Sequence, residues 1–433
     1  MKNTYTKNNK ILRTTGVALI LFLMITAAGT AFPLRPWNHT ENPVFLSTGN
    51  RSFFEIGASS SQGFQNSYFT TGKIFTPTLI IDFDDIYESI GKGGLKVGAN
   101  WNAESHMTAH ILGVGAGVYA HSENLFQVTI PSGLFELLSK GNEIDKTVSG
   151  TGEAFLQSYV EYGGYGSYRW EPYTFGAKLG KYIPLAYSSG GEARYEFTTN
   201  KDGTIDATAT IDTNLYSAID IESLTEGDED VDPMAVLNES GGLKVDLGVV
   251  YNPDRSRPLW GASITNIPLY APFAEYGWEF TAEGSASTEG LLDSLEEDED
   301  EDGDESEPFD TSSTSDFTPI EDISKRLYMP FGINGFYRYT RVPLIDIIGH
   351  GGLVIAKPFR YNLGATVEGS FFPLSILSLS LAHEDMAWRS SAGIRINLRI
   401  LELGIQAGFS SPELLGMFST RGFTTNIVLG IGF

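Results

Sequence analysis

The last eleven residues of the chain alternate strictly between two kinds of residue, and this pattern constrains the fold more than any other feature. On an extended strand, one face would carry mainly large apolar side chains: Phe423, Thr425, Ile427, Leu429, Ile431 and Phe433. The other face would carry small or polar ones: Thr424, Asn426, Val428, Gly430 and Gly432. Because side chains alternate with period two along a strand, such a strand suits lipid on one side and a polar lumen on the other. A strand of a soluble β-sandwich would alternate as well.

Similar segments recur along the chain and predict an all-β fold. The C-terminal hundred residues contain further candidate strands at 332–340, 361–370, 375–382, 390–398 and 401–409. Upstream candidates are 154–170, 173–183, 193–199, 204–221, 243–251 and 259–265, and weaker ones are 52–59, 67–75, 95–101 and 109–120. Asp202 and Gly203 form a two-residue hairpin-turn signal. We therefore expect a closed antiparallel transmembrane β-barrel of about 14 to 18 strands.

The N-terminus has the features of a secretory signal peptide. A basic region precedes an apolar run at 16–28, and the small residues Gly29 and Ala31 follow. This order predicts cleavage after Ala31, which leaves 32–433 as the mature barrel. A membrane anchor would need about 20 apolar residues. The sequence has no second apolar segment near 18 residues, so a mature chain that spans a membrane does so as a closed barrel. The absence of cysteine excludes disulfides, a lipid-bearing cysteine and thiolate metal sites.

The acidic excess is confined to two segments. Residues 220–239 contain eight carboxylates and residues 283–322 contain seventeen, with no Lys or Arg in either. The 25 negative charges of these carboxylates are equal to the whole net charge of -25. Blocks of like charge repel themselves, so both segments are predicted to be loops. Counting strands back from Phe433 places 283–322 outside the cell and 220–239 on the periplasmic side.

The second acidic segment also contains a partial calcium-binding pattern. Asp298, Asp300, Asp302 and Gly303 fit positions 1, 3, 5 and 6 of an EF-hand loop. Position 12 would be Phe309, where a bidentate Glu is required. We therefore predict diffuse attraction of cations and no specific metal site.

Two short segments have helical spacing, and four tryptophans lie near predicted strand ends. Residues 82–90 and 132–140 carry apolar residues at i, i+3 and i+4, and Ser132 is a candidate cap for the second. These helices would be periplasmic or part of a plug inside the barrel. Aromatic girdles at the two membrane interfaces would explain Trp101, Trp170, Trp260 and Trp388, although tryptophans of an ordinary core would fit too.

Several motifs resemble those of known outer-membrane barrels. Residues 241–253, read as Gly-Gly-Leu-Lys-Val-Asp-Leu-Gly-Val-Val-Tyr-Asn-Pro, followed by 259–266, resemble a recurring hairpin of FadL-like barrels. Residues 130–142 and 175–182 resemble an uncharacterised branch of porin-like barrels, known only as a domain of unknown function. The resemblance implies one large barrel with an N-terminal segment inside the lumen. FadL-like members move hydrophobic solutes, but their Asn-Pro-Ala plug signature stands here as Asn42-Pro43-Val44.

The sequence does not indicate an enzyme. His106 and His110 would share a strand face, but no Gly-x-Ser-x-Gly elbow and no His-Glu-x-x-His motif occurs. His383, Glu384 and Asp385 are expected in a polar loop between strands. We predict no catalytic residue, no cofactor and, because of the acidic balance, no nucleic-acid partner.

These observations predict a passive channel or transporter of the bacterial outer membrane for small solutes, hydrophobic ones included. The alternative is a structural or surface-interaction barrel whose acidic loops bind cations or partners. A third reading is a secreted soluble β-sandwich. The expected partners of the barrel are outer-membrane lipid and the barrel-assembly machinery, with Leu429, Ile431 and Phe433 as the assembly signal.

Overall fold

The computed structural model describes residues 42–47, 53–70, 82–201, 204–219, 241–253, 258–288, 310–372, 374–398 and 400–432. The predicted signal peptide, the acidic segment 220–239, the partial calcium-binding pattern at 298–303 and Phe433 lie outside these residues. Within the described part, no helix has both the length and the apolar run that a membrane crossing by a helix would need.

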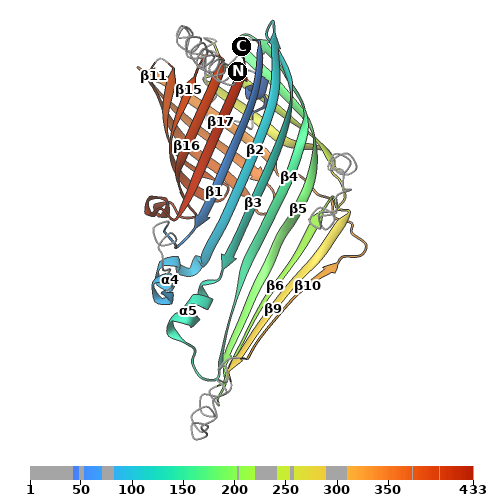
Figure 1. Cartoon of the computed structure of the whole chain (residues 1–433), viewed down its shortest axis with the longest axis vertical. Helices are drawn as coiled ribbons and strands as arrows, with labels where there is room; N and C mark the ends of the chain where they lie inside the picture. The colour runs from blue at the N-terminus through green and yellow to red at the C-terminus, as the bar shows by residue number, and fades with distance from the viewer. Residues whose placement is uncertain are drawn as a thin grey trace, which may run out of the picture.

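Fourteen strands form a closed antiparallel ring (Figure 1). The ring closes between the last strand and the first, with Glu55 opposite Gly432 and Gln65 opposite Gly422. The ring strands, in order around the barrel, are β1 (Phe54–Asn66), β2 (Leu95–Ile111), β3 (Val114–Ile130), β4 (Lys146–Trp170), β5 (Tyr173–Thr199), β7 (Gly242–Tyr251), β8 (Trp260–Tyr270), β11 (Phe331–Val342), β12 (Ile345–Ile355), β13 (Arg360–Phe372), β14 (Ser375–Glu384), β15 (Ala387–Asn397), β16 (Leu401–Ser411) and β17 (Gly422–Gly432). The predicted closed antiparallel barrel is confirmed.

Three further strands extend this sheet beyond the ring: β6 (Ile205–Ser217), β9 (Tyr276–Thr288) and β10 (Asp310–Pro319). β4 and β5, with 25 and 27 residues, are much longer than the other ring strands and run past the rim. β6 pairs with the outer half of β5, β9 pairs with β6, and β10 pairs with β9. We call this sheet, together with the outer halves of β4 and β5, the blade; Figure 1 shows it projecting below the barrel. The described residues thus hold seventeen strands, within the predicted range.

The blade corrects the prediction that 283–322 is one loop. Residues 283–288 belong to β9, and 310–319 form β10. In these strands the carboxylates occupy alternate positions, so their charge lies on one face of the sheet. The charge therefore does not prevent the strands from pairing. The registers place these carboxylates of β6, β9 and β10 on the same face: Asp206, Asp212, Glu279, Glu283 and Asp316. These three strands contain no Lys or Arg.

Three other strand predictions differ from the structure. In the predicted strand 67–75, residues 67–70 follow the end of β1 without forming a strand, and 71–75 lie outside the described residues. Residues 173–183 and 193–199 were predicted as separate strands, but β5 runs through both, with a register shift between Tyr187 and Glu192. Residues 109–120 were predicted as one strand, but they hold the turn between β2 and β3, where Leu112 and Gly113 have positive φ. Ser217 and Gly242, the strand ends that flank 220–239, lie on the blade side of the barrel, as do Thr288 and Asp310. The count that placed the two acidic segments on opposite sides of the barrel is therefore wrong.

The ring presents apolar side chains outward and polar ones inward. On β17, Ile427, Leu429 and Ile431 are 49%, 42% and 56% exposed. Thr424 and Asn426, at the alternate positions, line the cavity inside the ring. The predicted two-faced strand is therefore confirmed in the described residues, and the apolar outer surface suits lipid.

The two rims of the barrel differ in loop length. One rim carries short turns between β2 and β3, β4 and β5, and β11 and β12 (Figure 1). The start of β1 and the end of β17 lie on the same rim. The other rim carries the blade and the long connections after β1, β3 and β16, together with the short ones at 356–359 and 385–386. Short turns face the periplasm in bacterial barrels, so the blade side is expected to face outward. Trp170 and Trp260 lie near strand ends on the short-turn rim, and Trp388 lies near the start of β15 on the other rim, as predicted, whereas Trp101 lies in the middle of β2.

Both predicted helices form, and neither enters the lumen. α4 (Phe83–Ile90) and α5 (Ser132–Lys140) pack together on the blade-side rim, burying Ile86, Ile90 and Phe135. Pro131, with no side-chain hydrogen bond, occupies the capping position predicted for Ser132. The segment inside the barrel is instead α2 (Pro43–Ser47).

Candidate functional site

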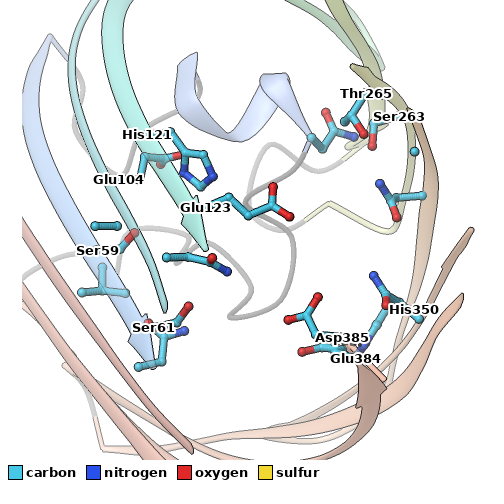
Figure 2. Close-up of a pocket in the computed structure, with 18 of the residues that line it drawn as sticks. Ser59, Ser61, Glu104, His121, Glu123, Ser263, Thr265, His350, Glu384 and Asp385 are labelled. Carbon is cyan, nitrogen blue, oxygen red and sulfur yellow. Dashed lines mark hydrogen bonds and ion pairs between the residues drawn. The ribbon is translucent and has the colours of Figure 1, made fainter. Parts of the chain in front are cut away.

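A cavity of about 300 Å³ lies inside the ring and is lined by charged and polar side chains. Figure 2 shows Glu104, His121 and Glu123 on one wall. His350, Glu384 and Asp385 lie on the opposite wall and face them across the cavity. The lumen of this barrel is therefore polar, in contrast to its apolar outer surface.

Four charged residues from β4, β5 and β7 form an ionic cluster in the wall of the cavity. Glu161 Oε1 lies 2.6 Å from Lys178 Nζ, and Glu161 Oε2 lies 2.5 Å from Lys244 Nζ. Lys244 Nζ also lies 3.1 Å from Asp246 Oδ2 and donates to Asn266 Oδ1 at 2.6 Å. The two cations balance the two carboxylates. Buried charges are tolerated when they are paired and hydrogen-bonded in this way.

The motif at 175–182 supplies one side of this cluster and the space around it. Alternate residues of the motif face inward: Gly176, Lys178, Gly180 and Tyr182. A Cβ atom at Gly180 would lie 2.1 Å from the hydroxyl of Tyr119. Lys178 Nζ lies 3.9 Å from the centre of the Tyr119 ring, which places a cation over an aromatic face. Glycine at position 180 therefore lets a tyrosine lie beside the lysine.

The motif at 241–253, with its downstream Asn266, supplies the other side. Lys244 and Asp246 face the lumen from β7. Asn266 has a left-handed φ of 59°, and its backbone N–H donates to Asp246 Oδ1 at 2.6 Å. The side chain of Asn266 donates to the carbonyl of Pro330 at 2.6 Å. The motif therefore ties the ionic cluster to a chain segment that crosses the barrel mouth.

The short helix α2 is anchored to the barrel wall by Asn42. Its side-chain amide donates to the carbonyl of Ala262 at 3.1 Å and to that of Val249 at 3.4 Å. Its side-chain oxygen accepts from the backbone N–H of Val44 at 3.1 Å, which caps the helix. The implied entry of an N-terminal segment into the lumen is confirmed for residues 42–47, and Asn42-Pro43-Val44 forms its attachment.

Two glycines of the wall make room for α2. A Cβ atom at Gly248 would lie 2.2 Å from Asn42 Oδ1, and one at Gly176 would lie 2.7 Å from the backbone nitrogen of Val44. Phe45 packs against Phe336 with ring centres 5.6 Å apart. The helix therefore lies directly on the inner wall and narrows the lumen.

The two facing walls of the cavity differ in their charges. On β1 and β2, His106 Nε2 lies 3.2 Å from Glu55 Oε1, and His106 Nδ1 lies 3.9 Å from Glu104 Oε1. On β15, Arg389 lies 3.1 Å from Asp385 Oδ2. Arg395 on the same strand lies 3.6 Å from Glu402. Both walls therefore hold a histidine–carboxylate pair, since His350 Nε2 lies 3.2 Å from Glu384 Oε1, and β15 adds arginine–carboxylate pairs.

Residues 325–330 close off the outer end of the cavity. Tyr182 donates its hydroxyl to the carbonyl of Leu327 at 2.9 Å, and Tyr159 donates to the carbonyl of Tyr328 at 3.2 Å. Met329 and Pro330 line the lumen cavity and also a second cavity of about 630 Å³ on their outer side. These two residues therefore lie between the two cavities.

The chain matches the model of a family of unknown function, DUF5723, over residues 46–400. The chain belongs to DUF5723. This confirms the predicted uncharacterised branch of porin-like barrels. A comparison with curated proteins finds no match.

Solved structures that resemble this DUF5723 barrel include transporters of the predicted FadL-like kind. The toluene transporter TbuX of Ralstonia pickettii is 9% identical, with a TM-score of 0.42 over 94% of this chain and 95% of that one. The Pseudomonas putida toluene transporter TodX is 11% identical, with a TM-score of 0.34 over 93% and 95% of the two chains. The translocator domain of the autotransporter NalP from Neisseria meningitidis is 6% identical, with a TM-score of 0.28 over 88% and 89%. All three identities are below 12%, and all three TM-scores are below 0.5.

Two of the three residues predicted as an assembly signal lie on the outer surface of the DUF5723 barrel. Leu429 and Ile431 are exposed on β17, and Phe433 lies outside the described residues. The structure shows their position and leaves their role a prediction. The polar loop predicted at 383–385 is wrong for His383 and Glu384, which end β14, and only Asp385 lies in the turn.

Sequence reasoning did not single out the ionic cluster. Lys178, Lys244 and Asp246 stand within the two motifs that carry the family resemblance, but no role was assigned to them. Glu161 lies in a strand whose neighbours the sequence does not reveal. The cluster could have been found from charged residues at the inward positions of strands whose outward positions are apolar. A charge inside a barrel needs a partner of opposite charge.

Proposed function

We propose that this chain is a passive channel of the bacterial outer membrane for small polar solutes. The observation that carries the proposal is the charged cavity enclosed by a ring with an apolar outer surface. A polar lumen and a lipid-facing exterior are the two properties of a barrel that passes hydrophilic solutes. The charged lining favours polar solutes over the hydrophobic ones that the FadL-like resemblance implies.

The geometry supports a path with two narrow points. A solute entering from the blade side would meet Met329 and Pro330, then the lumen cavity, then α2. The predicted signal peptide, residues 1–31, would deliver the chain to the periplasm, from which it enters the outer membrane. Both narrow points lie on buried, hydrogen-bonded backbone, so the resting path is constricted.

The experiment is a pair of transport measurements on the refolded chain. In planar bilayers we expect discrete conductance steps, and in liposomes we expect swelling with a pentose such as arabinose and none with raffinose. Protein that inserts, shows heat-modifiable migration on a gel, and still passes neither ions nor arabinose would contradict the proposed channel.

The C-terminal strand is proposed to act as the assembly signal. Removing Phe433, or replacing Leu429 and Ile431 with serine, is expected to reduce the amount of barrel inserted in the outer membrane, because these positions supply its apolar outer face. The conductance of the barrels that do form should not change. Insertion can be measured by heat-modifiable migration of membrane fractions. Insertion equal to that of the parent chain would contradict the role.

A further inference from the structure

The outer chamber differs from the lumen in the balance of its charges. Its walls come from Gln157 on β4, Tyr187 on β5, residues 324–326 and 328–330, and residues 355–357. We call this chamber the vestibule. Three of its lining residues are cations, and none is an aspartate or glutamate. Glu321 and Asp322 precede the segment in the chain and do not line the chamber.

Neighbouring backbone and aromatic rings hold two of these cations in place. The carbonyl of Lys325 accepts from the backbone N–H of Ala274 at 2.8 Å, and Arg326 forms a β-bridge with Phe273. The guanidinium of Arg326 lies 4.5 Å from the centre of the Phe273 ring. Aromatic faces attract cations without neutralising them, so the positive charge remains available to a ligand.

The vestibule cations differ from the lumen cations in their ion pairs. Lys178, Lys244, Arg389 and Arg395 each lie within ion-pair distance of a carboxylate. In the part of the chain that the structure describes, no carboxylate makes such a pair with the vestibule cations Lys325, Arg326 and Lys357. All three of these cations are exposed to solvent, so they can meet an anion that enters the vestibule from outside.

The polar groups around the chamber add hydrogen-bond donors. Tyr187, Tyr328 and Ser324 bring hydroxyl groups to its walls. The amide oxygen of Gln157, which is 1% exposed, accepts from Arg360 at 3.2 Å. A ligand with several acceptor oxygens and more than one negative charge would satisfy both the cations and these donors.

We propose that the vestibule binds small polyvalent anions, whose clustered oxygens belong to phosphate or polycarboxylate groups. This proposal gives a solute class to the proposed channel. Passage of the anion beyond the vestibule rests on that proposed function, whereas binding in the vestibule does not. Met329 and Pro330 separate the vestibule from the mixed charges of the lumen. The bound anion therefore sits at the entrance, before the carboxylates Glu104 and Glu123 of the inner wall.

Titration calorimetry on the full chain in detergent tests the site directly. Pyrophosphate and citrate are the two probes, and acetate and arabinose are the monovalent and neutral controls. We expect binding of one or both polyanions, weakened by added sodium chloride, and at least about tenfold weaker binding when Lys325, Arg326 and Lys357 are all replaced by glutamine. Comparing pyrophosphate with citrate distinguishes phosphate from carboxylate recognition.

A second triple variant controls for net charge. Lys92, Lys140 and Lys201 lie on the blade side, away from the vestibule, and their replacement by glutamine removes the same charge. This control should bind the polyanions as the parent chain does. Equal loss in both variants, or no polyanion binding by a parent chain with normal heat-modifiable migration, would overturn the site. Because binding in detergent needs no conductance, a sealed barrel that binds pyrophosphate would refute the channel and retain the vestibule.

Discussion

Replacing Gly248 with valine is expected to raise the conductance of the barrel several-fold. A Cβ atom at this position would lie 2.2 Å from Asn42 Oδ1 and 2.9 Å from Pro43, so α2 could no longer lie against the wall. The strand itself should tolerate the change, since β-branched residues suit strands. Single-channel recording in planar bilayers measures the effect, and faster liposome swelling with raffinose would report the wider lumen.

A matched control is available on another ring strand. A Cβ atom at Gly349 would meet no atom within 4 Å, and the residue is exposed on the outer face of β12. Gly349→Val adds the same side chain without touching α2 and should conduct as the parent barrel does. Equal conductance of Gly248→Val, Gly349→Val and the parent chain would show that α2 does not limit flow.

Replacing Lys244 with methionine is expected to lower the free energy of unfolding by about 3–5 kcal/mol, because it breaks a buried ionic cluster. Lys178 alone would then face Glu161 and Asp246, which leaves one buried carboxylate without a balancing charge. Asn266 would also lose the donor to its side-chain oxygen. Urea titration in lipid vesicles, followed by heat-modifiable migration, gives the free energy.

Two companion variants identify the cause of this loss. Lys92→Met removes an exposed lysine and should change stability by no more than about 0.5 kcal/mol. Adding Glu161→Gln to Lys244→Met should restore part of the stability, because it removes the unbalanced charge. If Lys244→Met were as stable as Lys92→Met, the cluster would have no structural role.

The two-residue period predicted the ring well, because lipid and lumen impose opposite demands on alternate positions. The two-residue period failed for β5, where one long strand was predicted as two. The segments 173–183 and 193–199 were predicted as two strands, but in the structure β5 shifts register between Tyr187 and Glu192 and continues into the blade. A bend absorbed by a bulge and a true turn use the same residues, so the sequence alone does not separate them.

The candidate site was harder to predict because it depends on which strands are neighbours. Lys178 lies opposite Asp246 because β5 pairs with β7, skipping β6. Glu161 lies opposite Tyr182 through the pairing of β4 with β5. Sequence periodicity gives the face of each residue but not its partner across the sheet. The two motifs lie on β5 and β7, which are two of the three strands that hold the ionic cluster. The position of the third strand, β4, became known only from its register with β5.

With the blade side facing outward, as expected from the short turns of the opposite rim, the blade would meet the surroundings before the proposed channel does. Its strand β6 has 13 residues, which corresponds to about 44 Å at the usual rise, against an apolar band of about 25 Å in barrels of this kind. Large agents that approach the cell, such as antibodies or phages, would touch the blade before the barrel mouth. Selection for evasion would then act on β6, β9 and β10, while selection for uptake would act on the vestibule and lumen. The two surfaces are therefore free to diverge at different rates during evolution.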